Sequence, residues 1–251
     1  MMKISVQLYS LREVGDLDAQ LALARACGFE WVESVVTHGL PAADFALRVR
    51  GHGLKVSSMH ASLALLESDL TSVVDACDAT GCPLVIMPWL PMGERVADAA
   101  AWRAFGQRLA GLGDALRARG LRFAYHNHDF EFLAYDGRAA LEWIFADSAA
   151  PQVGWEADLG WVCRAGADPW HWTERYRDRL VAIHAKDIAP ARTAIDEDGW
   201  AALGAGVVPW GQLLPQLATT VDLFVFEHDR PKDAERILRA SHAFLVKHLG
   251  G

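Results

Sequence analysis

Eight short apolar runs alternate with longer amphipathic segments along the chain, and this alternation constrains the fold more than any other feature. The runs lie at residues 3–9, 30–35, 54–60, 84–88, 122–127, 153–158, 180–186 and 223–227. Segments such as 18–27, 98–119 and 232–249 carry Ala, Leu and Arg at the three- and four-residue spacing of a helix with one buried face. Glycines such as Gly81 and Gly120 stand where a helix would end before a strand. The pattern predicts successive βα units.

The length fits eight such units closed into one barrel. Eight units in 251 residues average about 31 residues each, which is the usual size of a βα unit. No Ser/Pro-rich linker divides the chain, and no G-x-G-x-x-G follows the first run, which disfavours a doubly wound dinucleotide-binding sheet. The sequence therefore predicts an α/β protein with a single (β/α)8 TIM-barrel domain over residues 1–251.

Charge and hydropathy narrow the choice of partners. The formal net charge is −8, from 24 Lys and Arg against 32 Asp and Glu, and no basic run is present. Nucleic-acid binding depends on neutralising phosphates, so the composition argues against it. No apolar stretch approaches the roughly 20 residues that span a bilayer, and the first residues lack the apolar core of a signal peptide. We expect a cytoplasmic protein without a membrane partner; the sequence leaves open whether it forms a homodimer.

Polar and ionisable residues gather where the predicted strands end. These residues are Gln7, Tyr9, Glu33, His60, His126, Asn127, His128, Glu156, Asp158, His184, Lys186, Glu227 and Asp229. The active site of a TIM barrel lies at the carboxyl ends of its strands, so these side chains should converge. Because side chains alternate between the faces of a strand, Glu156 and Asp158 share one face, as do His184 and Lys186.

A ring of imidazoles and carboxylates in an apolar barrel needs a compensating charge, and a divalent cation would supply it. Taken alone, each of these residues is better explained as a loop-capping or hydrogen-bonding group than as a ligand. Asp158, His184 and Glu227 come from three successive strand ends and are the strongest ligand candidates. A mixed oxygen and nitrogen ligand set suits Mn²⁺ or a similar ion.

Several short motifs resemble one superfamily. The motifs are QLYSLR (7–12), GFEWVE (28–33), KVSSMH (55–60), YHNHDFEF (125–132), EADLGW (156–161), HAKD (184–187) and FEHD (226–229). They resemble the xylose isomerase-like TIM-barrel superfamily of sugar phosphate isomerases and epimerases, and they extend over nearly the whole chain. This superfamily also contains inosose dehydratases, other lyases and endonuclease IV-type DNA repair enzymes.

The resemblance implies one divalent ion held by Glu, Asp, His and Glu from strands five to eight. Asp158, His184 and Glu227 match the last three positions. The first Glu is missing, and His126 takes its place, with Glu131 as the alternative. Mn²⁺ is the expected ion, and Mg²⁺, Co²⁺ and Zn²⁺ are alternatives. The departure also weakens the two-glutamate proton exchange of the epimerases.

The resemblance implies chemistry at a carbon beside a carbonyl. The metal would polarise the carbonyl of a keto-sugar and stabilise an enediolate. Glu156 or Glu227 would take the proton, and Lys186 or His60 would protonate the opposite face or a departing oxygen. Lys186 could instead pair only with Asp187 or Glu227. Return of the proton gives isomerisation or epimerisation, whereas loss of a β-substituent gives a lyase.

The expected substrate is a small sugar or cyclitol. Its predicted contacts are Gln7, Tyr9, His60, Asn127, His128, Trp161 and Asp229. The segment 203–210 contains two glycines before a proline and could cradle a phosphate, although a nonphosphorylated substrate is favoured. The alternatives are an inosose dehydratase or keto-glycoside eliminase, and a sugar-binding barrel without enzymatic activity.

Overall fold

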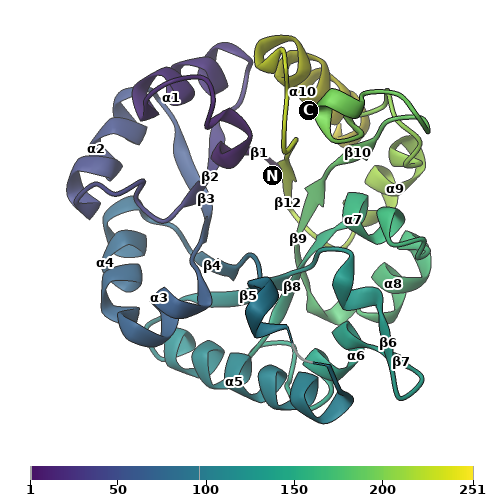
Figure 1. Ribbon diagram of the computed structural model, residues 1–251. Coiled ribbons are helices and arrows are strands. Elements are labelled where there is room, and N and C mark those ends of the chain that lie inside the picture. Colours follow the sequence, from purple (N-terminus) through teal and green to yellow (C-terminus); the bar gives the residue numbers. More distant parts are fainter. Residues whose placement is uncertain (1, 96, 251) are drawn as a thin grey trace.

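The computed structural model describes residues 2–95 and 97–250, and eight parallel strands in it close into a barrel (Figure 1). Neighbouring strands follow the order β1-β12-β9-β8-β5-β4-β3-β2 around the barrel. The strands are β1 Lys3–Gln7, β2 Trp31–Val35, β3 Lys55–His60, β4 Leu84–Met87, β5 Arg122–His126, β8 Gly154–Asp158, β9 Leu180–Ala185 and β12 Leu223–Phe226. The predicted TIM barrel is confirmed.

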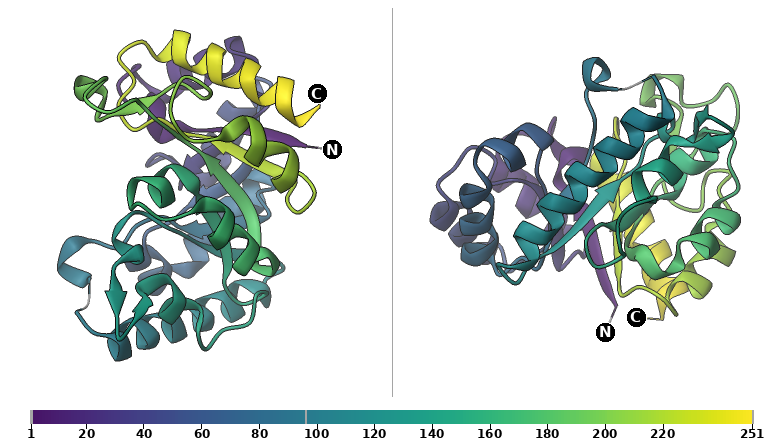
Figure 2. Two further views of the ribbon diagram at one scale, coloured as in Figure 1. Left: turned by 90° about the vertical axis from the view of Figure 1, so that its right-hand side faces the viewer. Right: turned by 90° about the horizontal axis from the view of Figure 1, so that it is seen from below.

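Helices surround the barrel on its outer side (Figures 1 and 2). They are α1 Leu17–Ala26, α2 Ala42–Gly51, α3 Leu63–Ser68, α4 Leu70–Thr80, α5 Ala99–Arg117, α6 Ala140–Phe145, α7 Leu159–Arg164, α8 Pro169–Arg175, α9 Trp210–Leu217 and α10 Ala234–Leu249. The start of β1 and the end of α10 lie side by side (Figure 2). Within the described ranges, we find no helix long and apolar enough to cross a bilayer.

Local sequence signals fix the helix ends. Asp16, Asp98 and Asp233 each accept a hydrogen bond from the backbone N–H three residues on, which caps α1, α5 and α10. Gly81 and Gly120 have φ of +72° and +78°, as the predicted left-handed ends of the preceding helices require. The predicted helices therefore differ from the observed ones by only one or two residues at each end.

The connections also carry short elements. Two-residue strands pair β6 Ala134–Tyr135 with β7 Arg138–Ala139, and β10 Asp187–Ile188 with β11 Trp200–Ala201. The 3-10 turns are η1 Leu8–Leu11, η2 Met92–Glu94, η3 Phe130–Phe132, η4 Arg177–Arg179 and η5 Ile195–Glu197. Most of these elements follow the carboxyl ends of barrel strands, where loops shape the site of a TIM barrel.

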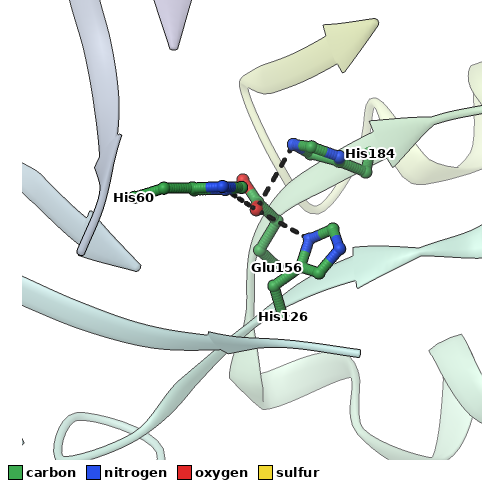
Figure 3. Close-up of side chains that lie close together, drawn as sticks. All are labelled: His60, His126, Glu156 and His184. Atoms are coloured by element: carbon green, nitrogen blue, oxygen red, sulfur yellow. Dashed lines mark hydrogen bonds and ion pairs between the residues drawn. The ribbon is translucent and has the colours of Figure 1, made fainter. Parts of the chain in front are cut away.

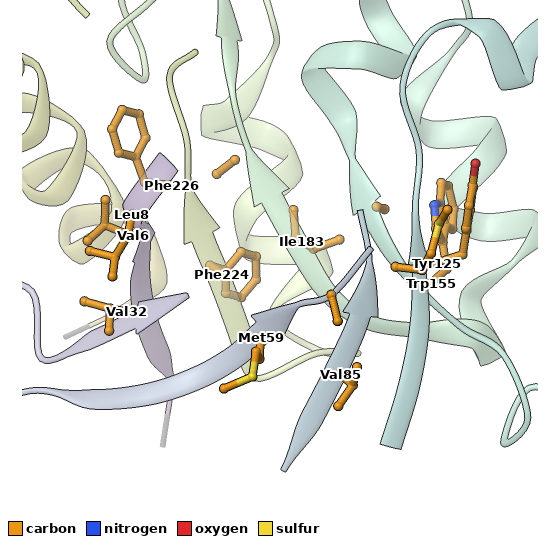
Figure 4. Packing of buried hydrophobic residues seen from close by; sticks show 14 of the residues in the cluster. Val6, Leu8, Val32, Met59, Val85, Tyr125, Trp155, Ile183, Phe224 and Phe226 are labelled. Atoms are coloured by element: carbon orange, nitrogen blue, oxygen red, sulfur yellow. The ribbon is translucent and has the colours of Figure 1, made fainter. Parts of the chain in front are cut away.

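Two apolar clusters hold the barrel together. The larger one packs the strands against the helices, and Figure 4 shows part of it, including Val85, Ile183 and Phe224. The smaller cluster comes from alternate positions of β4, β5, β9 and β12. Its members are Leu84, Ile86, Ala124, Ala182, Leu223 and Val225. Because alternate side chains face opposite sides of a strand, the smaller cluster fills the barrel interior.

The same alternation places the polar residues beyond this apolar filling. On β12 and just after it, Leu223 and Val225 are followed by Glu227, and on β9 Ala182 is followed by His184. The strand register pairs His126 with Glu156. The fold thus brings the predicted strand-end residues to one end of the barrel.

Candidate metal centre and active site

Glu33 is the hub of a buried hydrogen-bond network at the carboxyl end of the barrel. Its carboxylate accepts hydrogen bonds from Gln7 Nε2 at 2.8 Å, Ser58 Oγ at 2.5 Å and His184 Nε2 at 2.6 Å. The Nε2 atom of His60 lies 2.9 Å from the same carboxylate. Burial alone would raise the pKa of Glu33, but the charges of His60 and His184 hold that pKa well below its usual value.

The register of β2 and β3 helps to build this network. The pairing shifts by one residue between Val32 and Glu33, so that Glu33 lies opposite Ser58 and Ser57 has no partner of its own on β2. A similar shift between β8 and β9 places Glu156 opposite Ala182. Such irregularities redirect side chains near functional sites, and both occur where the polar layer begins.

Glu156 is the second buried carboxylate, and three imidazoles surround it (Figure 3). Its Oε2 atom lies 3.0 Å from His60 Nε2, 3.0 Å from His126 Nδ1 and 3.4 Å from His184 Nε2. Burial and the charge of Glu33 raise the pKa of Glu156 to about 8. The pKa values of the buried carboxylates and imidazoles around Glu33 and Glu156 therefore depend on one another.

A second group of ligand atoms converges on the other side of His126 and His184. The four atoms from His126, Asp158, His184 and Glu227 all lie within 4.8 Å of one another. His184 Nδ1 is 3.4 Å from Glu227 Oε2 and 3.8 Å from Asp158 Oδ2, and His126 Nε2 is 3.8 Å from Asp158 Oδ2. In a tetrahedral site with metal–ligand bonds of about 2.1 Å, two ligand atoms lie about 3.4 Å apart, and the observed separations are close to this value.

Two atoms of this group lack any hydrogen-bond partner although they are buried. They are Asp158 Oδ2 and His184 Nδ1. An unpaired buried polar atom is costly, and a cation between these donors would satisfy both. The four residues thus fit a divalent ion with mixed oxygen and nitrogen ligands, as the sequence predicts.

His126 and His184 each contact both the ligand group and a buried glutamate of the inner network. His184 uses Nε2 toward Glu33 and leaves Nδ1 for the ligand group, while His126 uses Nδ1 toward Glu156 and leaves Nε2. A carboxylate behind a metal-binding imidazole fixes its tautomer and orientation. Glu33 lies behind His184 in this way, and Glu156 lies behind His126.

The protonation of the ligand group differs from residue to residue. Burial and the neighbouring charges of His184, His128 and other cations hold the pKa of His126 well below its usual value, so its ring is neutral. Burial alone would lower the pKa of His184, but Glu156 and Glu33 raise it well above the usual value. Burial raises the pKa of Asp158 to about 6, even though Lys186 opposes this shift.

Lys186 is buried beside the ligand group among three carboxylates. Its Nζ atom lies 2.7 Å from Glu227, 2.8 Å from Asp229 and 3.6 Å from Asp158, and it lies 4.7 Å from the centre of the Trp200 ring. Burial alone would lower the pKa of Lys186, but the charges of Asp229, Glu227 and Asp158 raise it above its usual value. Lys186 therefore stays protonated.

The carboxylate of Asp187 binds backbone N–H groups of the following loop. It accepts hydrogen bonds from the backbone N–H groups of Ile188 at 2.9 Å, Gly204 at 2.9 Å, Gly206 at 3.1 Å and Val208 at 3.1 Å. An internal carboxylate thus fills the cradle that the sequence of 203–210 suggested for a phosphate. Of the two partners considered for Lys186, the structure provides Glu227.

Glu131 does not reach the ligand group. Its carboxyl accepts hydrogen bonds from the Tyr125 hydroxyl at 2.5 Å and from the His128 backbone N–H at 2.9 Å. Burial raises the pKa of Glu131 to about 7. Of the two residues considered for the missing first ligand, the structure brings His126 to the group.

A cavity of about 540 Å³ opens above the ligand group. It is lined by Tyr9, Val35, His60, Pro88, Trp89, Arg95, His126, His128, Asp129, Phe130, Trp161, Glu227 and Asp229. Five of the seven predicted substrate contacts are among these residues, and so is Glu227. The cavity therefore adjoins the predicted site.

Six predicted site residues do not line this cavity: Asp158, His184 and Lys186, which belong to or adjoin the ligand group, and Gln7, Asn127 and Glu156. The side-chain amide of Asn127 bonds Trp155 Nε1 at 2.8 Å and both the N–H and the C=O of Asp158 at 3.1 Å, so it ties the ends of β5 and β8 together. Gln7 bonds Glu33 within the inner network. Glu156 lies in the same inner layer.

Glu33 was not among the predicted site residues, although the sequence places it at the end of the second strand. Its partners His60 and His184 follow it by 27 and 151 positions, and the register alone does not reveal contacts across a barrel. The available signal was the carboxylate of Glu33 inside the run Glu-Trp-Val-Glu-Ser-Val (30–35), whose other glutamate, Glu30, precedes the strand. A buried charge inside an apolar strand requires a partner.

The fold and this ligand group define an α/β-barrel protein with a candidate metal centre at the carboxyl ends of its strands. A family model described as xylose isomerase-like TIM barrel matches residues 21–248. The chain therefore belongs to the xylose isomerase-like TIM-barrel family. Members of this family are mostly enzymes that act on small sugar-like substrates.

Solved structures share the whole fold. A sugar phosphate isomerase/epimerase from Parabacteroides distasonis is 20% identical with a TM-score of 0.80, and 98% of each chain is covered. The probable 3-DHS dehydratase AsbF from Bacillus anthracis is 14% identical with a TM-score of 0.72, covering 98% of this chain and 99% of that one. The IolI protein with a bound zinc atom is 16% identical with a TM-score of 0.75, covering 99% and 98%. A comparison with curated proteins found no match.

Proposed function

We propose that this protein is a divalent-metal-dependent isomerase or epimerase of a keto-sugar or related polyol, and that His126, Asp158, His184 and Glu227 hold the ion. The observation that carries the proposal is the pair of buried, unpartnered atoms, Asp158 Oδ2 and His184 Nδ1, within this four-residue group. The two atoms lie 3.8 Å apart, which is too long for a hydrogen bond between them.

The nature of the ligands supports Mn²⁺ as the ion. Two carboxylates and two imidazoles form a mixed set that suits Mn²⁺ and also accepts Zn²⁺ or Co²⁺, whereas Mg²⁺ prefers oxygen ligands. The zinc atom in the IolI structure shows that this fold can hold such an ion. When bound, the ion would supply Lewis-acid polarisation of a substrate carbonyl.

The chain's own residues supply proton transfer and orientation. Glu227 lines the cavity; burial would raise its pKa, but Lys186 and His184 hold that pKa well below the usual value, so its carboxylate is charged. Lys186 is a permanent cation beside Glu227 and can stabilise negative charge that develops on a substrate oxygen. We assign the role of base to Glu227 in preference to Glu156, which lies below the cavity.

The substrate contacts that we propose are the predicted residues that line the cavity. They are Tyr9, His60, His128, Trp161 and Asp229. Burial and the charge of Lys186 lower the pKa of His128 to about 3, so its ring is a neutral hydrogen-bonding group. Since Asp187 fills the backbone cradle of 203–210, the substrate need not carry a phosphate.

A lyase is the second candidate, and the position of Glu156 favours it. A two-glutamate epimerase needs carboxylates at both faces of the sugar, but Glu156 is not among the cavity-lining residues, and His126 replaces the first glutamate of the family pattern. Glu227 with the ammonium of Lys186 would suffice to remove a proton and assist the departure of a β-substituent.

Hydrogen exchange distinguishes these reactions. We would incubate the Mn²⁺-loaded protein in D₂O with keto-sugars and inososes and follow deuterium incorporation and products by NMR. An epimerase returns labelled sugar, whereas a lyase forms an unsaturated product. Glu227→Gln should abolish exchange, while Asp129→Asn, a matched change in another cavity-lining carboxylate, should retain it. A fully active Glu227→Gln enzyme would remove Glu227 from the mechanism.

The same experiment tests the non-enzymatic alternative. A sugar-binding barrel should bind its ligand without stoichiometric ion and tolerate EDTA. The proposed enzyme should lose exchange activity and thermal stability when the ion is removed. Exchange at an undiminished rate after complete removal of metal would contradict the proposal.

A further inference from the structure

The mouth of the cavity is apolar, in contrast to its ionisable base. Tyr9, Val35 and Trp89 line it with exposed fractions of 45%, 40% and 44%. They are three of the eight exposed large apolar side chains in the described part of the chain, and the other five are Leu47, Met92, Leu133, Ile195 and Val207. Exposed apolar groups that gather around one opening indicate a binding surface.

Guanidinium groups lie against two of these aromatic rings. Arg12 lies 4.0 Å from the centre of the Tyr9 ring and donates a hydrogen bond from Nη1 to the Tyr9 carbonyl at 2.8 Å. Arg95 lies 5.7 Å from the centre of the Trp89 ring and 3.6 Å from that of Phe130. Its Nε donates to the Leu90 carbonyl at 3.1 Å. The rings are thus positioned before any ligand arrives, which lowers the entropic cost of binding.

The size of the cavity exceeds what a single sugar ring requires. A volume of about 540 Å³ falls in the range of about 300–1,000 Å³ that takes a drug-sized ligand. Glu227 and His126 belong to the ionisable part of the lining and Tyr9 and Trp89 to its apolar part, so the cavity can hold a sugar ring and a further substituent. Both residues belong to the same continuous cavity as Glu227.

The faces that line the mouth suit an uncharged planar group. Glu227, Asp229 and Asp129 contribute carboxylates to the cavity, while Arg95 is the only Arg or Lys side chain among its lining residues. Lys186 already pairs with Glu227 and Asp229, and an uncharged planar group can stack on the indole, phenol and guanidinium faces of the mouth.

We propose that the substrate is a sugar or cyclitol that carries an uncharged aryl substituent, and that this substituent stacks between Tyr9 and Trp89. The assignment of the sugar part rests on the proposed function. The aryl subsite rests on the apolar mouth alone, because Trp89 and Tyr9 do not belong to the ligand group.

Matched glycosides test this subsite. The phenyl and methyl β-D-glycosides of glucose, galactose and xylose, together with phenol alone, would be titrated into the Mn²⁺-loaded protein by calorimetry and saturation-transfer NMR. We expect phenyl glycosides to bind about tenfold more tightly than their methyl partners, with the strongest saturation transfer to the aryl protons. Equal affinity within the pairs, or no transfer to any phenyl ring including phenol, would overturn the proposal.

Substitutions of Trp89 test whether this residue provides the preference for phenyl glycosides. Trp89→Ala should bring the phenyl-to-methyl affinity ratio toward one, and Trp89→Phe should retain most of the preference because an aromatic face remains. Leu47→Ala is the matched control, since Leu47 is exposed on α2 and does not line the cavity. A ratio that is unchanged in Trp89→Ala would contradict the proposed stacking.

The outcomes separate this proposal from the proposed function. If the phenyl preference persists in the EDTA-treated protein but no substrate exchanges hydrogen, the aryl subsite stands and the metal-dependent reaction fails. If unsubstituted keto-sugars exchange hydrogen and the phenyl preference is absent, the reaction stands and the aryl subsite fails.

Discussion

His126 occupies the position at which the family resemblance implies a glutamate, and its two ring nitrogens face different layers of the site. Nδ1 bonds Glu156 at 3.0 Å, and Nε2 belongs to the ligand group. A neutral imidazole binds a transition metal as well as a carboxylate does but contributes no charge. The ligand set that we propose therefore carries one negative charge less than that of the family pattern, and Lys186 reduces the charge further.

Removal of this imidazole should weaken metal binding. We predict that His126→Ala lowers Mn²⁺ affinity by about 100-fold or more, because groups behind a ligand already contribute about 10–100-fold. Calorimetry and metal analysis of the purified variant would measure the loss. His128→Ala is the control, since His128 lines the same cavity but belongs to neither group of potential ligands. Equal affinities in the two variants would show that His126 does not bind the ion.

Lys186 should stabilise the metal-free protein by its charge. In Lys186→Met, the carboxylates of Glu227 and Asp229 lose their cation while buried, which should lower the free energy of unfolding by about 3 kcal/mol in EDTA. Added Mn²⁺ should recover part of this loss. Urea unfolding with and without Mn²⁺ would measure both effects.

The matched control for Lys186→Met is Lys232→Met, because Lys232 pairs with Asp196 at the surface. Exposed ion pairs contribute little, so this variant should unfold close to wild type. A Lys186→Met protein as stable in EDTA as the wild type would contradict the proposed charge compensation.

At the scale of elements, the loop after β9 depends on one side chain. The four N–H groups that Asp187 binds lie in Ile188 and in residues 204–208. Asp187→Ala should expose these amides and lower the free energy of unfolding by about 2–4 kcal/mol, since hydrogen bonds to a charged group contribute about 1.5–3 kcal/mol each and are not additive. Hydrogen exchange of the 203–210 peptide should accelerate.

Asp198→Ala is the control for this prediction, because Asp198 pairs with Arg164 on the same side of the barrel but makes no contact with the 204–208 amides. Sulfate should slow the exchange in Asp187→Ala, because an external anion would replace the lost carboxylate. Unchanged exchange in Asp187→Ala would show that other contacts hold the loop.

The elements were predictable because periodicity and helix ends are local properties of the sequence. The eight strands and the ends of α1 and α5 follow from patterns within a few residues, and so does the placement of Asp158 and His184 at strand ends. The remaining features depend on contacts between distant segments. Glu33 meets His184 across the barrel, and the binding of the 203–210 amides by Asp187 depends on how one loop folds back on β10.

At the scale of the whole molecule, we expect the proposed metal binding to be coupled to protonation. In the metal-free protein, Glu156 and Glu33 outweigh the effect of burial and hold the pKa of His184 well above its usual value, so the ring is charged at neutral pH. Binding an ion at Nδ1 requires that proton to leave, while the Nε2–H group stays with Glu33. Burial raises the pKa of Asp158 to about 6, so a second proton competes with the ion below pH 6.

The direction in which Mn²⁺ affinity changes with pH follows from these protonation states. The metal-free protein binds more protons than the metal-bound protein, so Mn²⁺ affinity should rise as pH rises. The rise should approach about tenfold per pH unit where the His184 proton alone is displaced, and it should be steeper below about pH 6, where Asp158 is protonated as well. Because a ligand of the folded state stabilises it in proportion to RT ln(1 + [L]/Kd), added Mn²⁺ should raise the melting temperature more at pH 8 than at pH 6. Calorimetry in buffers of different ionisation enthalpy would count the released protons, and an affinity independent of pH would show that His184 is not a ligand.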